Sequence, residues 1–304
     1  MHAIRLLAAL VLIACGLFAS SGAQAAESYD NCTNFVESVP ATITTQGVWC
    51  LHKDLATSIV SGAAITIANH NVTLDCNDFK LGGLAAGDES QAYGIYAVGR
   101  LNATVRNCNV RGFYYGIYLY EGTGHLLEDN RLDNNLVTAL ATLYASNSII
   151  RNNRVYDTGG YPDNNPRFGI YAYGGDAVEI TDNTVAGVIG TAGYYNDVTG
   201  IQRGNYIAGS GSNFASAHIT GNRVSGLMPT GAGKVASGLK SANYGNTSAM
   251  VLIAGNHLVM TVPVAGSTGI NCLYTGASMR DNNVRGFPTA FGGSCMNDGG
   301  NVSH

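Results

Sequence analysis

Tyrosines, a few basic residues and scattered carboxylates are the side chains of this 304-residue sequence that could act on a substrate. Cleavage of an acidic polysaccharide by elimination needs a group that neutralises a uronate carboxylate and a group that removes a proton. Arg203, Lys240 and Tyr171 are the candidate catalytic residues for that reaction. Hydrolysis would instead need two carboxylates at a defined separation. The available carboxylates, which show no evident pairing in the sequence, are Asp163, Asp176, Glu179 and Asp197.

Tyrosine is a candidate for sugar binding because its ring offers an apolar face and its hydroxyl can make a hydrogen bond. The chain has 17 tyrosines and one tryptophan. Tyrosines that pack on one another across strands also stabilise a sheet, and this structural role stays open beside sugar binding. The candidate substrate-binding residues are Tyr96, Tyr118, Tyr120, Arg167, Tyr171, Tyr173, Asp197 and Gln202.

Metal-ligand spacing is missing from the sequence. There is no Cys-x-x-Cys pair, and His125, His218 and His257 are expected to be ordinary strand or turn residues. We predict no metal and no other cofactor. A calcium ion at the Asp/Asn-rich loop 163–165 is the alternative.

A repeat that runs through most of the chain positions these candidates. Residues 127–132 read LEDNRL and residues 150–155 read IRNNRV, and similar segments recur at 105–110, 180–185, 219–224, 253–258 and 279–284. A degenerate copy, LDCNDF, opens the series at 74–79. The fourth position of the copies holds Asn77, Cys108, Asn130, Asn153, Asn183, Asn222, Asn256 and Asn282.

The repeat predicts a solenoid with one β-coil per copy. The shortest steps, from Cys108 to Asn130 and from Asn130 to Asn153, are 22 and 23 residues, which is too short for a pair of helices. The segments are short, rich in β-branched and aromatic residues, and bounded by Gly and Asn, as is typical of strands. We expect each Asn to occupy a sharp turn, where it tolerates left-handed backbone, and to hydrogen-bond the Asn of the next coil about 4.8 Å away.

With these motifs the chain resembles the right-handed parallel β-helix proteins of the pectate-lyase-like superfamily, over residues 63–304. The segments VPATITTQGVWCL (39–51) and GAAITIANHNVTLDCNDFKLGG (62–83) are similar to secreted bacterial proteins of this class. The resemblance implies an all-β, single-stranded right-handed parallel β-helix of about eight to nine coils with an N-terminal cap. It also implies that the strand after the variable turn forms the substrate groove. No single activity is implied, because the superfamily includes lyases, hydrolases, epimerases, esterases and non-enzymatic surface proteins.

Residues 1–25 have the features of a signal peptide, namely Arg5, an apolar core at 6–18 and the cleavage site Ala23-Gln24-Ala25. The alternative is a lipoprotein anchored through Cys15, because residues 12–15 resemble a lipobox. No later run is long and apolar enough for a transmembrane segment. We therefore expect an extracytoplasmic protein, secreted or periplasmic, with an N-terminal cap at 26–62 and the β-helix at 63–304.

Charge and cysteine content limit the partners and the cell compartment. Without Arg5 the chain has 15 basic and 20 acidic residues, a balance that argues against nucleic acid. An acidic polymer would need a local basic patch. The six remaining cysteines favour disulfides, and their coil register predicts the pairs Cys32–Cys50, Cys76–Cys108 and Cys272–Cys295. Free buried thiols are the alternative.

Strand alternation then separates buried from exposed positions. If the Ile of each Gly-Ile strand points inward, the next residue points outward, which places tyrosines such as Tyr96, Tyr118 and Tyr171 on one face. The loops 157–168, 187–199 and 225–237 should line one edge of that face. On another face, charges that alternate in sign predict a row of ion pairs. This row contains Asp75, Arg106, Glu128 and Arg151.

Two functions stay open. The first is a monomeric protein that binds a polysaccharide or a cell-surface glycan along the tyrosine-lined face without catalysis. The second is a lyase-like or hydrolase-like enzyme that acts on a glycan. The polygalacturonase, pectin methylesterase and alginate epimerase motifs are absent, which favours the first.

Overall fold

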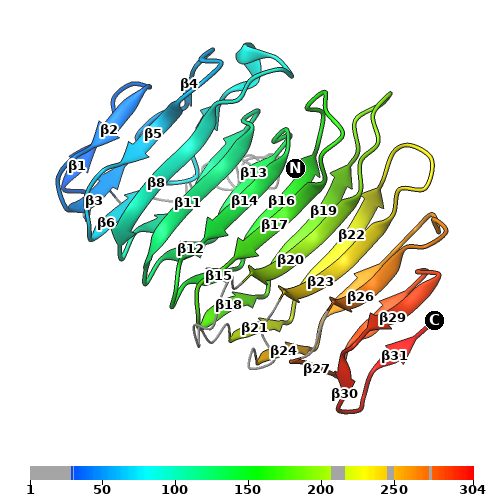
Figure 1. Cartoon of the computed structure of the whole chain (residues 1–304). Helices are drawn as coiled ribbons and strands as arrows, with labels where there is room; N and C mark the ends of the chain where they lie inside the picture. Colours follow the sequence, from blue (N-terminus) through cyan, green and yellow to red (C-terminus); the bar gives the residue numbers. More distant parts are fainter. Residues whose placement is uncertain (1–28, 30, 207–215, 245–249, 274–275) are drawn as a thin grey trace, which may run out of the picture. The chain divides into compact units, whose positions relative to one another are not determined.

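The computed structural model describes residues 29, 31–206, 216–244, 250–273 and 276–304, and within them the predicted fold is confirmed. The chain winds through three parallel β-sheets, each coil contributing one strand to each sheet in turn (Figure 1). The only helical turn among these residues is the 3₁₀ turn η1 (Leu84–Ala86). The predicted signal peptide and Cys15 lie outside the described residues.

Sheet 1 follows the variable turns and has ten strands: β2 (Ala41–Ile43), β5 (Ala63–Ile67), β8 (Tyr93–Leu101), β11 (Tyr115–Thr123), β14 (Thr138–Leu143), β17 (Arg167–Tyr173), β20 (Val198–Tyr206), β23 (Ala236–Tyr244), β26 (Thr268–Leu273) and β29 (Thr289–Gly293). Sheet 2 has eleven strands: β1 (Asn34–Phe35), β3 (Gly47–Cys50), β6 (Val72–Asp75), β9 (Thr104–Arg106), β12 (Leu126–Glu128), β15 (Ile149–Arg151), β18 (Val178–Thr181), β21 (Ala217–Thr220), β24 (Val251–Ala254), β27 (Ala277–Arg280) and β30 (Met296–Asn297).

Sheet 3 has ten strands: β4 (Leu55–Ala56), β7 (Lys80–Gly82), β10 (Asn109–Arg111), β13 (Arg131–Asp133), β16 (Arg154–Thr158), β19 (Thr184–Ile189), β22 (Arg223–Met228), β25 (His257–Val259), β28 (Asn283–Arg285) and β31 (Val302–Ser303). Strands β1 to β4, which lie in the segment predicted as a cap, pair in parallel with strands of the following coils. That segment therefore continues all three sheets, and its boundary at residue 62 stays a prediction.

The core is a set of aliphatic columns that run from coil to coil. Ile95, Ile117, Leu140, Ile170 and Ile201 are paired in register on sheet 1 and have no exposed surface. Burial of each such side chain contributes about 1.5–3 kcal/mol before the cost of ordering the chain. The inward direction predicted for the Ile positions is confirmed, and it fixes the outward direction of the residue that follows each of them.

The asparagine ladder, formed by the buried column residues, joins sheets 2 and 3 at their short turn. Asn130 donates through Nδ2 to Asn153 Oδ1 at 3.0 Å, and Asn153 donates in the same way to Asn183 at 3.0 Å. The same bond repeats along the column to its last member, Asn301. The amides from Asn130 to Asn282 are buried, Asn301 is partly buried, and each also donates to a backbone carbonyl, as Asn153 does to Leu127 O at 2.8 Å. The predicted stacking of Asn130 on Asn153 is confirmed.

Two details of the predicted ladder are wrong. The residue with left-handed backbone is the one before each ladder Asn, such as Asp129 (φ 55°) and Asn152 (φ 56°), because the ladder Asn itself faces the core. Asn77 is not a ladder member. Leu74 pairs with Val105 but Leu81 pairs with Val110, so the turn of that coil contains two extra residues and carries Asn77 out of register.

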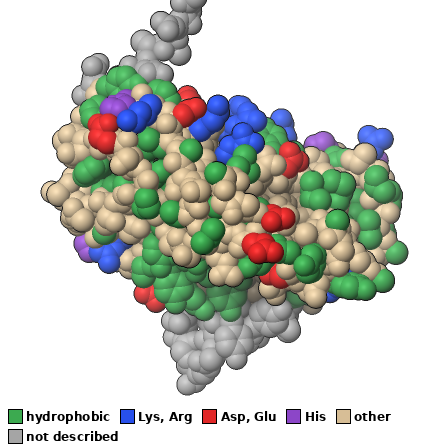
Figure 2. Space-filling model, turned by 90° about the horizontal axis from the view of Figure 1, so that it is seen from above, with side chains coloured by type: hydrophobic (Ala, Val, Ile, Leu, Met, Phe, Trp, Pro, Cys, Tyr) green, Lys and Arg blue, Asp and Glu red, His purple; other side chains and the backbone are tan. Residues whose placement is uncertain are grey.

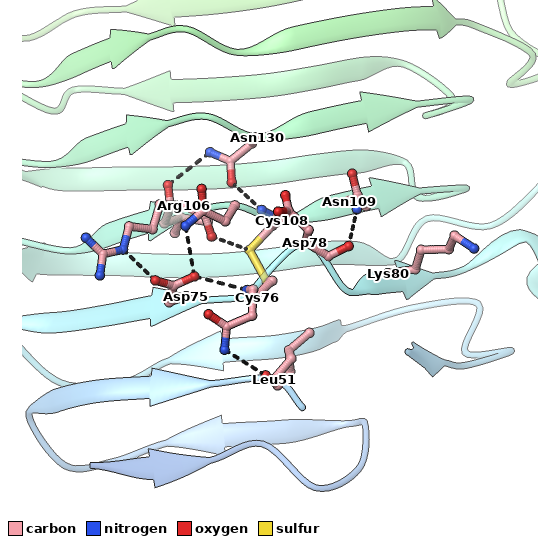
Figure 3. The surroundings of a disulfide bond; sticks show 12 residues. Leu51, Asp75, Cys76, Asp78, Lys80, Arg106, Cys108, Asn109 and Asn130 are labelled. Atoms are coloured by element: carbon pink, nitrogen blue, oxygen red, sulfur yellow. Dashed lines mark hydrogen bonds and ion pairs between the residues drawn. A yellow bond between two sulfur atoms is a disulfide. The ribbon is translucent and has the colours of Figure 1, made fainter. Parts of the chain in front are cut away.

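All three predicted disulfides are present: Cys32–Cys50, Cys76–Cys108 and Cys272–Cys295. Cys108 begins the asparagine ladder, since its backbone N–H donates to Asn130 Oδ1 at 3.1 Å, and its disulfide connects two neighbouring coils (Figure 3). The predicted row of ion pairs is also confirmed on sheet 2. Arg106 lies 2.7 Å from Asp75, and Arg151 lies 2.6 Å from Glu128.

Candidate functional site

The candidate site is the outward face of sheet 1, which we call the tyrosine face. One position per strand forms a row along it, because the strands pair in exact parallel register. All members of the row except the small, buried Ala141 keep part of their side chain exposed. The row consists of Tyr96, Tyr118, Ala141, Tyr171, Gln202, Lys240 and Asn271.

The tyrosine rings on this face contact one another in a continuous network. Tyr96 and Tyr118 stack with ring centroids 5.9 Å apart, and Tyr118 also stacks on Tyr120 at 6.4 Å. Tyr144 makes edge contacts with Tyr120 at 5.8 Å and with Tyr173 at 5.5 Å. The network thus crosses four successive strands, β8, β11, β14 and β17, although β14 itself contributes only aliphatic and small residues to the row.

Sequence reasoning missed Tyr93 and Tyr115, which join this network. Tyr93 stacks on Tyr115 at 5.7 Å and lies 5.0 Å from Tyr96. A Cβ at Gly94 would meet the buried Val110 and Phe113, so the glycine and the following Ile both face the core and the tyrosine before them turns outward. The signal was present as an aromatic-Gly-Ile-Tyr motif at 93–96, 115–118 and 168–171, but strict alternation assigns its first residue to the inside.

Several phenol groups on this face, those of Tyr93, Tyr115 and Tyr118, have raised pKa values and are neutral near pH 7. Burial, reinforced by neighbouring tyrosines such as Tyr93 and Tyr96, raises the pKa of Tyr118 to about 12. Burial also raises the pKa values of Tyr93 and Tyr115 above the ordinary value for tyrosine. A phenol with a raised pKa is a poor general base, but its O–H can still donate or accept a hydrogen bond.

Three loops form one rim that precedes the strands of the tyrosine face. Asn196 Nδ2, in the second loop, donates at 2.8 Å to the carbonyl oxygens of both Asp163 and Asn165 in the first. Thr230 Oγ1, in the third, donates to Thr191 O at 3.1 Å. Loops 157–168, 187–199 and 225–237 are therefore tied together, which confirms that they share one edge. Tyr161 extends the rim, since its ring makes an edge contact of 4.8 Å with Tyr114.

Arg167 was predicted to bind substrate, and this placement is wrong. Its side chain has no exposed surface, because it is the internal clamp of the first loop. The guanidinium lies 2.8 Å from Asp163 and donates to Asn165 O at 2.6 Å. Burial alone would raise the pKa of Asp163, but hydrogen bonds from Asn165 and Arg167 outweigh it and hold the pKa below its usual range.

Arg203 was a candidate catalytic residue, and the structure contradicts that role as well. Strand β20 continues to Tyr206, so alternation keeps Arg203 on the inner side together with Ile201, and its side chain is fully buried. It donates to the carbonyl oxygens of Gly174 at 2.8 Å and Gly204 at 2.7 Å. Burial lowers the pKa of Arg203 to about 10, partly offset by the charge of Asp176. The guanidinium group of Arg203 thus donates its hydrogen bonds to backbone carbonyl oxygens inside the coil.

The carboxylates offer no catalytic pair on the described part of the tyrosine face. Asp176 Oδ1 accepts hydrogen bonds from Ser216, which lower the pKa of Asp176 although burial acts in the opposite direction. Asp197, a predicted substrate-binding residue, accepts a bond from Val235 N at 2.9 Å and thereby joins two loops. Glu179 lies on sheet 2. The 163–165 loop uses its carboxylate on Arg167, and the described residues contain no cluster of three or more metal-ligating side chains.

The remaining predicted residues do come together. Tyr171 and Tyr173 lie on β17, beside Gln202 on β20, and Lys240 on β23 continues the row. Phe168 stacks on Tyr171 at 4.7 Å. Lys240 is half-buried and has no ion-pair partner among the residues that the structure describes. Among the described residues, the row therefore combines aromatic rings, the two amides of Gln202 and Asn271, and one cation without an ion pair, Lys240.

Comparison with known proteins returned one family model, described as "right handed beta helix region", which matches residues 55–232. Among solved structures, an alginate lyase from Paenibacillus sp. str. FPU-7 shares 15% identity over 87% of this chain and 100% of its own, with a TM-score of 0.45. A tailspike protein mutant of E. coli bacteriophage HK620, in complex with a pentasaccharide, shares 12% identity over 86% of this chain, with a TM-score of 0.49. This chain spans 57% of that tailspike chain. A search of curated proteins found no match.

Proposed function

We propose that this chain, which belongs to the family of right-handed β-helix regions, binds a polysaccharide along the tyrosine face and does not cleave it. The observation that carries the proposal is the continuous tyrosine network. In it, Tyr96, Tyr118 and Tyr171 occupy one row at successive coils, with Ala141 between Tyr118 and Tyr171. An extended sugar chain laid along the row would meet a new strand about every 4.8 Å. That spacing is close to the length of one sugar unit.

The chemistry of the face supports binding over catalysis. A lyase would need a base and a cluster of cations, yet Arg167 and Arg203 are buried, and Lys240 is the one predicted cation that remains on the face. A hydrolase would need two carboxylates, and Asp163, Asp176 and Asp197 are engaged in holding loops. Neutral phenols with raised pKa values suit hydrogen bonds to sugar hydroxyls.

The partner is then a polysaccharide or a cell-surface glycan met outside the cytoplasm. Three disulfides support this location, since disulfides persist in oxidising compartments. No helix among the described residues meets the length and hydropathy needed to span a membrane. Cleavage of a signal peptide at residue 25 and a monomeric state stay predictions.

The test is binding of neutral and acidic polysaccharides by titration calorimetry, with reducing ends and unsaturated products measured in parallel. If one ring–sugar contact is worth about 0.5–1.5 kcal/mol, Tyr118→Ala and Tyr171→Ala should each weaken binding roughly two- to tenfold. Tyr156→Ala, on sheet 3, is the matched control and should bind a neutral polysaccharide as the parent does; it is used for neutral ligands only, because the Tyr156 ring contacts Arg131. If a ligand is found and neither Tyr118→Ala nor Tyr171→Ala changes its affinity, the tyrosine face is not the site. Product release that Lys240→Ala abolishes would establish the lyase alternative.

A further inference from the structure

The outward face of sheet 3 carries a second row of side chains, on a different side of the coils from the tyrosine face. Parallel register places one member per coil, and no member is buried. Figure 2 shows one dense group of Lys and Arg side chains, while Asp and Glu are scattered over the same view. The row contains Lys80, Asn109, Arg131, Arg154, Thr184 and Arg223.

Lys80 lies 3.5 Å from Asp54, but the arginines of this row have no close carboxylate partner among the described residues. Arg131 and Arg154 are directly paired across β13 and β16, and like charges in that position destabilise a sheet. Arg154 and Arg223 have no ion pair with a described residue, and the carboxylate nearest to Arg131 is Asp133 at 3.9 Å. The row on sheet 2 differs, because its charges alternate and form short pairs. Arg131, which has this long contact with Asp133 and lies 5.2 Å from the centroid of the Tyr156 ring, thus sits directly beside Arg154 on sheet 3, where an added anion would relieve the repulsion between the two guanidinium groups.

A cavity of about 670 Å³ runs beside these cations, along the short turn between sheets 2 and 3. Its wall includes Arg131 and Arg154 on one side and the exposed turn residues Asp129, Asn152 and Asp182 on the other. Left-handed backbone at these three turn residues holds them at the surface while the adjoining ladder Asn faces inward. Three successive coils therefore present a guanidinium or hydroxyl on one side, from Arg131, Arg154 and Thr184, and a carboxylate or amide oxygen on the other.

We call this cavity the furrow, and we propose that it binds an acidic oligosaccharide. The anionic groups of the sugar meet Arg131 and Arg154, and its hydroxyls donate to the side-chain oxygens of the turn residues Asp129, Asn152 and Asp182. A neutral sugar would leave the paired arginines unneutralised. A polyphosphate chain such as nucleic acid would meet repulsion from Asp129 and Asp182 without offering them enough donors. An acidic sugar carries both an anion for Arg and hydroxyl donors for Asp or Asn on one ring, which matches the mixed wall.

The furrow also differs from the tyrosine face in the way it would bind. It has no aromatic ring in its wall, so its recognition would be polar and dependent on salt. Anionic groups can be carboxylates or sulfates, and the two share the same contacts with guanidinium. The Asp side of the wall selects for free hydroxyls beside the anion, which separates a sugar from a simple polyanion.

The test is titration of the full chain with oligogalacturonate, with a sulfated dextran, with a neutral maltooligosaccharide and with single-stranded DNA. Arg154→Gln should weaken oligogalacturonate binding about tenfold and reduce its salt dependence. Arg151→Gln is the matched control, because it lies three residues away in the same coil but belongs to the neutralised row of sheet 2. It should bind as the parent does. The loss caused by Arg154→Gln should also appear in a Tyr171→Ala background, so failure of this site and failure of the tyrosine face are distinguishable.

Asp129→Ala separates sugar recognition from ion exchange. It should weaken oligogalacturonate binding, because a hydroxyl acceptor is lost, yet strengthen binding of the sulfated dextran, because a negative charge is removed. Strengthened binding of both ligands would mean that the face is a non-specific anion exchanger, and the proposal would be wrong. Equal affinities for DNA and oligogalacturonate, or an unchanged affinity in Arg154→Gln, would overturn it as well.

Discussion

The asparagine ladder and the tyrosine face are built by the same device, a residue repeated at one position of successive coils, yet they satisfy their polar groups in opposite ways. Inside, each ladder amide gives and receives hydrogen bonds within the chain, as Asn153 does with Asn130, Asn183 and Leu127. Outside, the tyrosines contact one another mainly through their rings, which face solvent on one side of the coils. The inward asparagines therefore hold the coils together, and the outward tyrosines present a surface for recognition. Substitutions on the two sides should separate these roles.

The largest expected effect is on the inner side, at Asn183. Its amide accepts from the N–H and Nδ2 of Asn153 and donates to Ile150 O and Asn222 Oδ1. Asn183→Ala would leave several buried groups without a partner, so we expect the free energy of unfolding in urea to fall by about 3 kcal/mol. Thr184→Ala, the next residue and half-exposed on sheet 3, should change it by less than about 0.5 kcal/mol. Similar losses of unfolding free energy in the two variants would contradict the contrast between inward and outward residues.

An intermediate effect is expected at His125, an inward side chain that can gain a charge. Its Nδ1 accepts from Ala103 N at 3.3 Å and its Nε2 contacts Glu121 O at 3.2 Å. Burial lowers the pKa of His125, against a smaller raising effect of the Glu121 carbonyl. The folded chain therefore binds this proton less readily than the unfolded chain, in which the pKa is about 6.5.

The sign of the pH dependence follows from that difference. The contribution of neutral His125 to stability is fully present above about pH 6.5 and is lost as the pH falls toward the lowered folded value, by at most about 1.4 kcal/mol per pH unit for one proton. Urea unfolding at a series of pH values from neutral to mildly acidic should show this loss. His257→Gln, at an exposed site, should keep the parent slope, whereas His125→Asn should reduce it. Equal slopes in all three proteins would place the titration elsewhere.

The smallest effects are expected on the outer side and should differ in sign between two rows of charges. Glu128→Gln removes the partner of Arg151 on sheet 2, so stability should fall slightly, by much less than in Asn183→Ala, and the loss should vanish at high salt. Arg154→Gln removes a like charge opposite Arg131 on sheet 3, so stability should be unchanged or slightly higher. Parallel thermal melts at low and high salt would compare them. A larger loss in Arg154→Gln would mean that its row is structural.

The sequence predicted the parts of the fold that depend on register. The phase of the Asn repeat fixed the coils, and with the coils it fixed the ladder from Asn130 to Asn282, the disulfide from Cys76 to Cys108 and the outward tyrosines. The spacing of a repeated residue along the sequence shows which residues of successive coils are aligned, so the register can be read without the structure. Asn301 escaped notice because its step of 19 residues from Asn282 is shorter than the other steps.

The candidate site was harder to predict because loops and strand ends obey no period. Arg167 looked like a free cation beside the groove, but only the folded loop shows that three carbonyl groups and Asp163 surround it. Arg203 depended on whether β20 continued, which composition alone does not determine. Tyr93 and Tyr115 were lost to the assumption of strict alternation, which fails where a glycine packs against the core.

The positions of the three disulfides have a consequence for how the coils come apart. A stack in which each coil contacts only its neighbours unravels from its ends, since a terminal coil is held on one side only. Here the cross-links join residues 32 to 50, 76 to 108 and 272 to 295, and the sequence has no cysteine between 108 and 272. The covalent ties thus secure the early and late coils of the chain, while the central coils rely on the amide ladder. Reduction would turn one cooperative unfolding transition into progressive fraying that starts at both ends and reaches the loop-bearing middle last.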